Sequence, residues 1–325
     1  MQALSLSNAC EFGVYLNSAQ VFTLDLANAT LLEIVDEYIK FKSIQNPNSY
    51  KRFSSLIYRL KRIEEAFNCV LTPSQITDIF YNHFIAYQLD SNLALSTIES
   101  NCSQLSSILK WSTRYNCKVS PSYDEFKVSD YKTPKIALTQ DEVSHIYHFD
   151  LSAINRRPQL IKTLEKVRDH FVLSCNLGQR YSDMIRINAD CFDKNLFRIM
   201  QQKTGNKCKV DIDKYALDKK TVYKILQKYN FKAPYTATIY NYDKHLKELF
   251  MLIGGEFKEL VRYEVKVNGL VIEKYKEKYK LLASHTARRT FITVNTLRGF
   301  TPTDIRMASG HKTIMSLEGY QCLED

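Results

Sequence analysis

The final 42 residues of the chain contain side chains whose types and spacing suit phosphoryl transfer. The sequence His-Thr-Ala-Arg runs from His285 to Arg288, a Gly-His pair ends at His311, and Tyr320 lies nine positions after that histidine. Because His285 and Arg288 are three residues apart, a helix would present both on one face. A phosphate held there would meet a permanent cation and a titratable donor, which makes Tyr320 a candidate nucleophile.

Two more cations precede this segment. Arg180 comes shortly after an apolar stretch and after Gly178, and the glycine permits a tight bend that would set Arg180 at the start of a helix. Asp183, three positions on, could support the Arg180 guanidinium or a neighbouring histidine. Lys203 lies where a turn between two strands is expected, so its flexible ammonium could reach into a cleft.

These residue types fit the chemistry of phosphodiester cleavage. An oxygen nucleophile that attacks a phosphodiester builds negative charge on the non-bridging oxygens, and fixed guanidinium groups stabilise that charge. A phenol in water ionises only near pH 10, so a tyrosine nucleophile needs a cationic pocket and a proton acceptor. The arginines and histidines of the chain's second half could supply both.

The same residues carry a family resemblance. The segments SHTARRTF and SGHKT, with the spaced tyrosine, are similar to the motifs of the tyrosine recombinases, the phage-integrase family. The resemblance covers residues 138–325, extends more loosely to residues 30–117, and is to integrases carried by bacterial mobile genetic elements. Six residues of this sequence resemble the catalytic set of that family and occur in the same order: Arg180, Lys203, His285, Arg288, His311 and Tyr320.

This resemblance implies how the phosphate is held and attacked. Arg180 and Arg288 would clamp the phosphate, and His311 would donate a further hydrogen bond to it. Tyr320 would attack and form a 3′-phosphotyrosyl bond. That bond would conserve the energy of the broken linkage, so religation to a new strand would need no ATP.

The resemblance also implies how protons are moved. His285 would act as general base or as a phosphate ligand, and Lys203 would protonate the leaving 5′ oxygen. Asp183 would support these side chains from an adjacent position. No metal and no other cofactor is implied, because the protein itself would supply the positive charge.

Several of these residues have structural alternatives. Lys203 has Lys207 and Lys209 close by, and lysine-rich hairpins are usually only solvated; its place before the turn favours it. Arg289 would point away from Arg288 on a helix, so we assign it to the phosphate backbone or to a structural role. The chain has 21 tyrosines, and only the spacing from the histidine distinguishes Tyr320 among them.

The distribution of charge indicates a polyanionic partner. The chain carries 45 Lys and Arg against 35 Asp and Glu, a net charge of +10. Residues 1–137 contain 13 of each kind, so the whole excess lies in residues 138–325, which contain 32 against 22. A basic half of this kind suits a polyanion, most simply nucleic acid, although a solvated lysine-rich surface would give the same count. The family resemblance implies that this partner is double-stranded DNA.

Composition places the protein in a broad class. A hydrophobic fraction of 45% and a charged fraction of 25% are typical of a globular protein. The eight cysteines show no metal-ligand spacing, which indicates reduced thiols and no zinc site. No apolar run is long enough to span a membrane, and the N-terminus does not resemble a signal peptide. We therefore expect no membrane association and a bacterial cytoplasmic protein associated with the nucleoid.

Helical signals dominate the first half. A capping box at Thr30 predicts a helix to about Lys42, and a second helix is expected over 49–67. Another box at Thr72, with Pro73 at the first helical position, predicts a helix to about Leu89. A fourth helix is expected over 94–115. Four helices joined by short loops predict an all-helical, SAM-like core-binding domain over 30–117, preceded by a short arm or lead-in at 1–29.

The second half is expected to be mainly helical with small β-hairpins. Residues 118–137 lack helical periodicity and form the best candidate linker; a capping box at Thr139 then opens the catalytic domain, 138–325. Strand-like segments 196–202 and 207–212 flank a tight turn, and segments 261–267 and 270–275 flank Asn-Gly, a strong hairpin signal. The expected fold is therefore mainly α with small hairpins, an α+β class.

The function that best accounts for these residues and for the family resemblance is that of a site-specific DNA recombinase that integrates or excises a mobile element. A DNA invertase of the same family, a type IB topoisomerase-like nickase and a DNA-binding relic without activity are the alternatives. Recombination would require a homo-tetramer on DNA, with an accessory DNA-bending protein as a further candidate partner. Only five residues follow Tyr320, too few for a helix of their own, so an exchange of C-terminal segments between protomers is in doubt.

Overall fold

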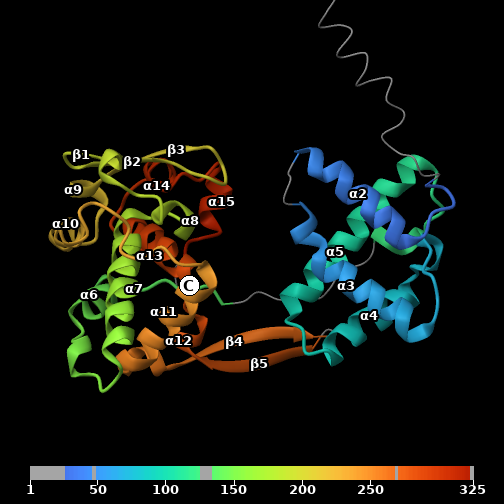
Figure 1. The fold of residues 1–325 in the computed structure, drawn as a ribbon, viewed down its shortest axis with the longest axis horizontal. Helices are drawn as coiled ribbons and strands as arrows, with labels where there is room; N and C mark the ends of the chain where they lie inside the picture. The colour runs from blue at the N-terminus through green and yellow to red at the C-terminus, as the bar shows by residue number, and fades with distance from the viewer. Residues whose placement is uncertain (1–25, 46–48, 125–133, 268–269, 323–325) are drawn as a thin grey trace, which may run out of the picture. The chain divides into compact units, whose positions relative to one another are not determined.

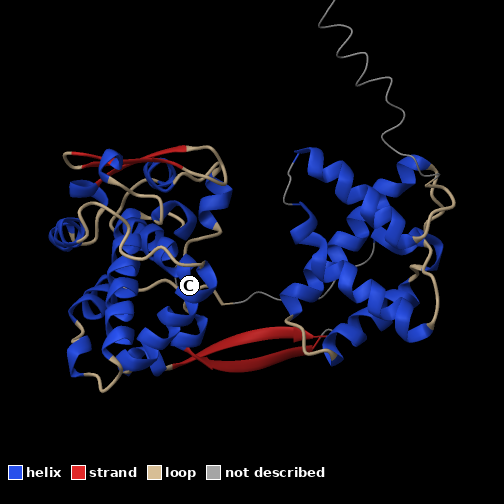
Figure 2. Cartoon of the chain, viewed as in Figure 1, coloured by secondary structure: helices blue, strands red, loops and turns tan. Residues whose placement is uncertain are grey.

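The structure is a computed structural model that describes residues 26–45, 49–124, 134–267 and 270–322. The described chain is mainly helical, with two small antiparallel sheets, as the sequence predicted (Figures 1 and 2). It divides near residue 131 into two compact units, each with its own hydrophobic core. The units are described one at a time below.

The first unit consists of helices packed around an apolar core. Its first helix begins with the predicted capping box: the Thr30 N–H donates to the Glu33 carboxylate at 2.8 Å, and the Glu33 N–H donates to Thr30 Oγ1 at 3.3 Å. Trp111 is buried in this core, against Tyr38. The helices are α2 (Leu31–Gln45), α3 (Ser49–Phe67), α4 (Asp78–Asp90) and α5 (Leu95–Ser112), with short 3₁₀ turns at Pro73–Gln75, Thr113–Tyr115 and Pro121–Asp124.

The helix predicted from Thr72 to about Leu89 is wrong in its first part. The Thr72 box forms, since the Thr72 N–H donates to Gln75 Oε1 at 2.8 Å, but it opens only a 3₁₀ turn. Ile76 is fully buried with a non-helical backbone, and Thr77 then caps α4 by accepting the Phe80 N–H. The burial of Ile76 and the Thr77 cap stabilise the observed break more than an uninterrupted helix from Thr72 would be stabilised.

The sequence predicts an N-terminal lead-in at 1–29 and a linker at 118–137, and parts of both lie outside the described residues. Within the described part, Leu26 and Ala29 are buried in the core of the first unit. The Cys117 thiol donates to the Leu26 carbonyl at 2.7 Å, so the two ends of the helical unit are held together.

The second unit is built around α7, whose C-terminal half is almost wholly buried. Helix α13 packs along α7, and α11 and α6 contact it as well (Figure 1). Helix α6 begins with the predicted Thr139 capping box. The helices are α6 (Gln140–His148), α7 (Pro158–Leu177), α8 (Tyr181–Met184), α9 (Ile212–Tyr215), α10 (Lys219–Lys228), α11 (Ile239–Ile253), α12 (Lys278–Leu281), α13 (Ser284–Leu297), α14 (Pro302–Ser309) and α15 (Ile314–Glu318).

Both predicted hairpins are present. Strands β2 (Leu196–Met200) and β3 (Lys207–Asp211) pair antiparallel, and β1 (Phe192–Asp193), which the sequence did not predict, adds an edge to β2. Strands β4 (Leu260–Val267) and β5 (Leu270–Glu277) form the second sheet, and the Asn-Gly turn between them lies outside the described residues. Strand β2 ends earlier than predicted, which leaves residues 201–206 as a longer turn.

The core of the second unit contains a buried histidine. His170 lies between Tyr181 and Tyr242, with ring centroids 5.2 and 5.1 Å away, and is fully buried. Neither ring nitrogen has a hydrogen-bond partner among the described residues. Burial lowers the pKa of His170 to about 3, so the folded protein holds it neutral.

This histidine should make the second unit sensitive to acid. Between pH 6.5 and about 3 the unfolded chain binds a proton at position 170 that the folded chain excludes, so stability falls as the pH falls through this window. The slope is at most about 1.4 kcal/mol per pH unit for one group. In urea titrations of the full chain, His170→Leu should lose less stability than wild type between pH 6.5 and 5. Exposed His148→Gln is the control, and an unchanged slope in His170→Leu would contradict this account.

Candidate active site

The bend after α7 sets the position of Arg180, as the sequence predicted. Gly178 has φ +66°, and a Cβ there would lie 2.3 Å from the Phe291 ring. Only glycine permits both this left-handed backbone and this close approach to α13. The chain then turns so that Arg180 is the extended residue immediately before α8, and its half-buried guanidinium donates to Gln201 Oε1 at 2.6 Å.

Helix α13 carries Arg288 into the centre of the site. Asp243, from α11, accepts the Ser284 N–H at 2.7 Å and so caps the start of this helix. The Arg288 side chain is fully buried. Its Nη1 donates to the Gly178 carbonyl at 3.1 Å, and its Nη2 lies 3.1 Å from both ring nitrogens of His311.

Arg288 is a buried cation without a carboxylate partner. Among the described residues no Asp or Glu oxygen lies within ion-pair distance of it, and its Nε has no hydrogen-bond partner. Burial, with Arg180 nearby, lowers the pKa of Arg288 to about 10. An isolated buried charge is costly, so the site is suited to an anion that restores the lost interactions.

His311 packs against this guanidinium. Nη2 of Arg288 is equally distant from both ring nitrogens, which places it over the imidazole face, not on the axis of one lone pair. Ser309 Oγ lies 2.8 Å from Nδ1 and also donates to the Ile305 carbonyl at 2.6 Å. When this hydroxyl rotates to donate to Nδ1, Nε2 carries the proton and can donate to a phosphate oxygen.

Burial and the two nearby arginines keep His311 neutral. Burial first, and then Arg288 and Arg180, lower the pKa of His311 to about 3. Burial and Arg289, Arg288 and Arg180 also lower the pKa of His285, although its side chain is exposed. A neutral His285 has a free lone pair near neutral pH and can accept a proton.

Tyr320 lies among these groups. Its ring centroid is 4.7 Å from that of His311, 6.3 Å from that of His285 and 5.6 Å from Arg288 Cζ. His285 and Arg288 therefore both face Tyr320, as their spacing on a helix predicted. The structure brings together Arg180, Arg288, His285, His311 and Tyr320 from four separate parts of the sequence.

The segment that carries Tyr320 is held by the same unit. Lys135 donates to the Gly319 carbonyl at 2.7 Å, immediately before the tyrosine. Beyond it, the Cys322 N–H donates to Thr293 Oγ1 at 3.1 Å and Gln321 donates to Thr296 Oγ1 at 3.2 Å. Lys135 thus holds the residue before Tyr320, and α13 holds the two residues after it.

Lys203 lies where the sequence predicted, whereas Asp183 makes a different contact from the one expected. Lys203 is exposed in the turn between β2 and β3, as predicted. Asp183 was expected to support Arg180 or a histidine; instead Oδ1 accepts the Gln202 N–H at 2.8 Å and lies 3.6 Å from Arg186. Because Arg180 precedes the helix with an extended backbone, the two do not share a helical face. Asp183 holds the turn that bears Lys203.

Sequence reasoning missed Gln201, which links the parts of the site. This buried side chain accepts hydrogen bonds from Arg180 and, at 2.9 Å, from Thr204 in the Lys203 turn. Its Nε2 donates to Gln179 Oε1 at 3.0 Å and to the Ser309 carbonyl at 2.7 Å. All four hydrogen-bonding positions of one amide are therefore used. A lone glutamine in a turn gives no signal in the sequence.

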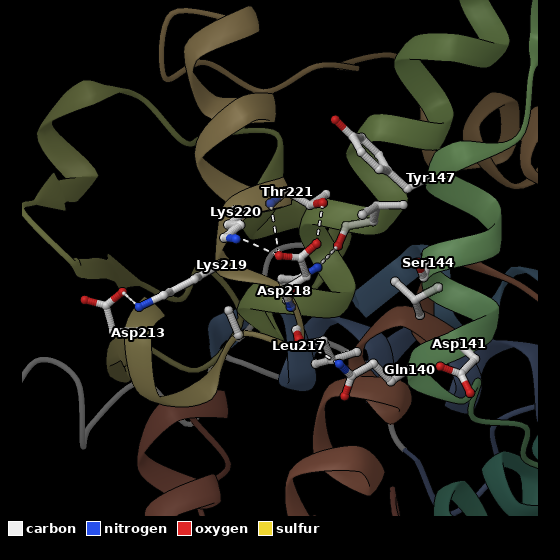
Figure 3. A pocket seen from close by; sticks show the side chains of 14 residues that line it. Gln140, Asp141, Ser144, Tyr147, Asp213, Leu217, Asp218, Lys219, Lys220 and Thr221 are labelled. Atoms are coloured by element: carbon white, nitrogen blue, oxygen red, sulfur yellow. Dashed lines mark hydrogen bonds and ion pairs between the residues drawn. The ribbon is translucent and has the colours of Figure 1, made fainter.

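A separate cavity of about 520 Å³ lies in the same unit, between α6, α7 and the start of α10 (Figure 3). Its polar groups are mostly paired with one another: Asp218 accepts the Lys220 and Thr221 N–H groups, and Lys219 is 3.1 Å from Asp213. Because these groups already bond to one another, the cavity has few polar groups left to bind a ligand.

Across the described ranges, no group of His, Cys, Asp or Glu is arranged to hold a metal, and no helix could cross a membrane.

Solved structures share this architecture. A lambda integrase dimer bound to a COC' core site matches 90% of this chain and 96% of that chain, with 15% identity and a TM-score of 0.64. The Tn1549 transposon integrase in complex with transposon right end DNA matches 91% and 96%, with 15% identity and a TM-score of 0.63. A lambda integrase tetramer bound to a Holliday junction matches 99% and 87%, with 14% identity and a TM-score of 0.62.

No protein-family model and no curated protein sequence matches the chain. At 14 to 15% identity, the likeness to these structures shows a common fold. The identity of each catalytic group depends on the geometry described above.

Proposed function

Because the chain has the fold of a tyrosine recombinase, we propose that it is a site-specific DNA recombinase. The observation that carries this proposal is the convergence of Arg180, Arg288 and His311 beside Tyr320. A buried guanidinium next to a phenol, with no carboxylate partner among the described residues, suits a phosphodiester. The excess of positive charge in residues 138–325 supports a DNA partner.

The first chemical step is attack on phosphorus. The Tyr320 hydroxyl gives its proton to neutral His285 as its oxygen bonds to phosphorus, and negative charge grows on the non-bridging oxygens. Arg180 and Arg288 stabilise that charge, with His311 donating from Nε2. The bond from phosphorus to the 5′ oxygen breaks, and Lys203 protonates this leaving group. The product is a 3′-phosphotyrosyl linkage and a free 5′ hydroxyl.

Religation is the reverse reaction with a new strand. A 5′ hydroxyl attacks the phosphotyrosyl linkage, Tyr320 leaves, and the proton returns to it. One ester replaces another at each step, so the reaction needs no external energy source. The cationic groups of the protein carry out the charge stabilisation, and Asp183 holds the turn that positions Lys203.

The same comparison supports a proposal for the biological setting. Among the similar structures are a Tn1549 transposon integrase in complex with transposon right end DNA and a lambda integrase tetramer bound to a Holliday junction. For this chain we propose integration or excision of a mobile element, with the helical residues 30–117 and the catalytic residues 138–325 both binding duplex DNA. Four protomers would exchange two duplexes. Inversion, and relaxation of one duplex without exchange, are outcomes that a recombination assay would separate.

Tyr320 should be the residue that becomes linked to DNA. A suicide duplex, nicked beside the cleavage point, should trap wild type as a covalent adduct, because the short 5′ product diffuses away. Tyr320→Phe should bind the same DNA and give no adduct, whereas Tyr240→Phe, at an exposed tyrosine, should react normally. An adduct with Tyr320→Phe would place the nucleophile elsewhere. Wild type that binds this DNA without forming an adduct would favour the inactive relic.

Gln201 should act by positioning Arg180 and the Lys203 turn. Gln201→Met removes all four hydrogen bonds at similar volume, so we expect single-turnover cleavage at saturating DNA to slow by roughly 10- to 100-fold, with a smaller change in DNA affinity. Gln201→Glu should also be slow, because its second oxygen would face the Ser309 carbonyl. Exposed Gln202→Met is the matched control. A wild-type rate for folded Gln201→Met would leave this residue with a structural role only.

A further inference from the structure

A second, strongly basic pocket adjoins the candidate active site. It has a cavity volume of about 270 Å³ and lies between β3 and the end of α14, elements that pack together in Figure 1. We call it the basic pocket. Its lining residues are Asn206, Lys207, Lys209, Arg306, Met307, Gly310, His311 and Lys312.

The fold brings its four cations together from two elements. Strand β3 alternates, so Lys207 and Lys209 are exposed on one face while Cys208 and Val210 are buried on the other. The chain then packs closely at Gly310, where φ is +72° and a Cβ would lie 2.2 Å from Cys208 Sγ. This turn after α14 places Arg306 and Lys312 beside the two lysines of β3.

The charges of the basic pocket are not neutralised. The lining contains no carboxylate, and within the described part of the chain none of its four cations forms an ion pair. Other lysines of the same unit are paired, such as Lys214 with Asp304 at 3.9 Å and Lys228 with Asp169 at 2.6 Å. Four unpaired cations around one hollow repel one another, and an anion held between them would relieve that repulsion.

The pocket shares His311 with the catalytic groups. His311 lines the pocket and also packs on Arg288 and Tyr320, so it separates the two sites by one side chain. A DNA strand carries phosphates every 3.4 Å of helix rise, and a strand held at Arg288 would continue past His311. We propose that the basic pocket binds a backbone phosphate of DNA close to the linkage that Tyr320 attacks, an inference that rests on the proposed function.

This assignment gives the lysines of the hairpin different tasks. Lys203 is not among the lining residues and remains the proposed acid at the turn. Lys207 and Lys209 bind a neighbouring phosphate and hold the strand in register. The ligand is a phosphodiester and not a nucleobase, since the lining offers cations and no aromatic ring apart from His311.

Salt dependence of DNA binding tests the proposal without cleavage. Fluorescence titrations of the full chain with a duplex substrate would be made between 50 and 200 mM salt. Each phosphate contact contributes a slope of about 0.9 to the fall of log K with log salt concentration. Arg306→Gln/Lys312→Gln should reduce the slope by about this amount and weaken binding. Lys162→Gln/Lys166→Gln, at exposed positions of α7, makes the same charge change and should leave the slope as in wild type.

A neutral methylphosphonate in the DNA identifies the ligand. The methylphosphonate would replace, one at a time, each linkage that flanks the cleaved one. At one of these positions it should weaken DNA binding by wild type. At that same position it should have no further effect on DNA binding by Arg306→Gln/Lys312→Gln. An unchanged salt slope would overturn the proposal. So would methylphosphonate and double-substitution effects on binding that add at every position. Additive effects with a reduced slope would place the contacted phosphate away from the cleaved linkage, which would also overturn the proposed position. Loss of the covalent adduct in wild type would overturn the proposed function and is measured separately.

Discussion

The burial of the Arg288 guanidinium, with no carboxylate partner in the described part of the chain, is the constraint on which the candidate site depends. Its partners are a backbone carbonyl, an imidazole face and a tyrosine ring, and these offset desolvation less well than an anion would. Each partner is fixed by a local feature. Gly178 permits α7 and α13 to approach, and Gly310 permits the chain after α14 to bring His311 into place.

Burial and the charge of the arginines together determine the state of the histidines. Burial first, and then positive charge from neighbouring arginines, lowers the pKa of both His285 and His311, so the site has two neutral imidazoles beside a phenol. A neutral His285 can take the phenol proton, and His311 can donate while its Nδ1 is held by Ser309. A site that tolerates unpaired positive charge gains most when a phosphate with growing negative charge enters it.

Local signals made much of the fold predictable. Thr30 and Thr139 cap helices where their side chains can reach a residue three positions on, and both hairpins follow from turn residues between alternating strands. Thr72 shows the limit, because the burial of Ile76 ended a helix that the local pattern would have continued. The candidate site could be predicted from the sequence where residue spacing is characteristic, as at His285, Arg288 and Tyr320. The contacts of Gln201, Asp243 and Asp183 join residues 19 to 41 positions apart, which no local pattern records.

The stability of Arg288→Met tests most directly whether this cation is present for an anion and not for the fold. The account predicts a free energy of unfolding within about 1 kcal/mol of wild type, or above it, because methionine fills the volume without a buried charge. The same variant should form no covalent adduct with a suicide duplex. A loss of about 3–5 kcal/mol, the cost of breaking a well-compensated buried charge network, would contradict the account and make Arg288 a structural residue.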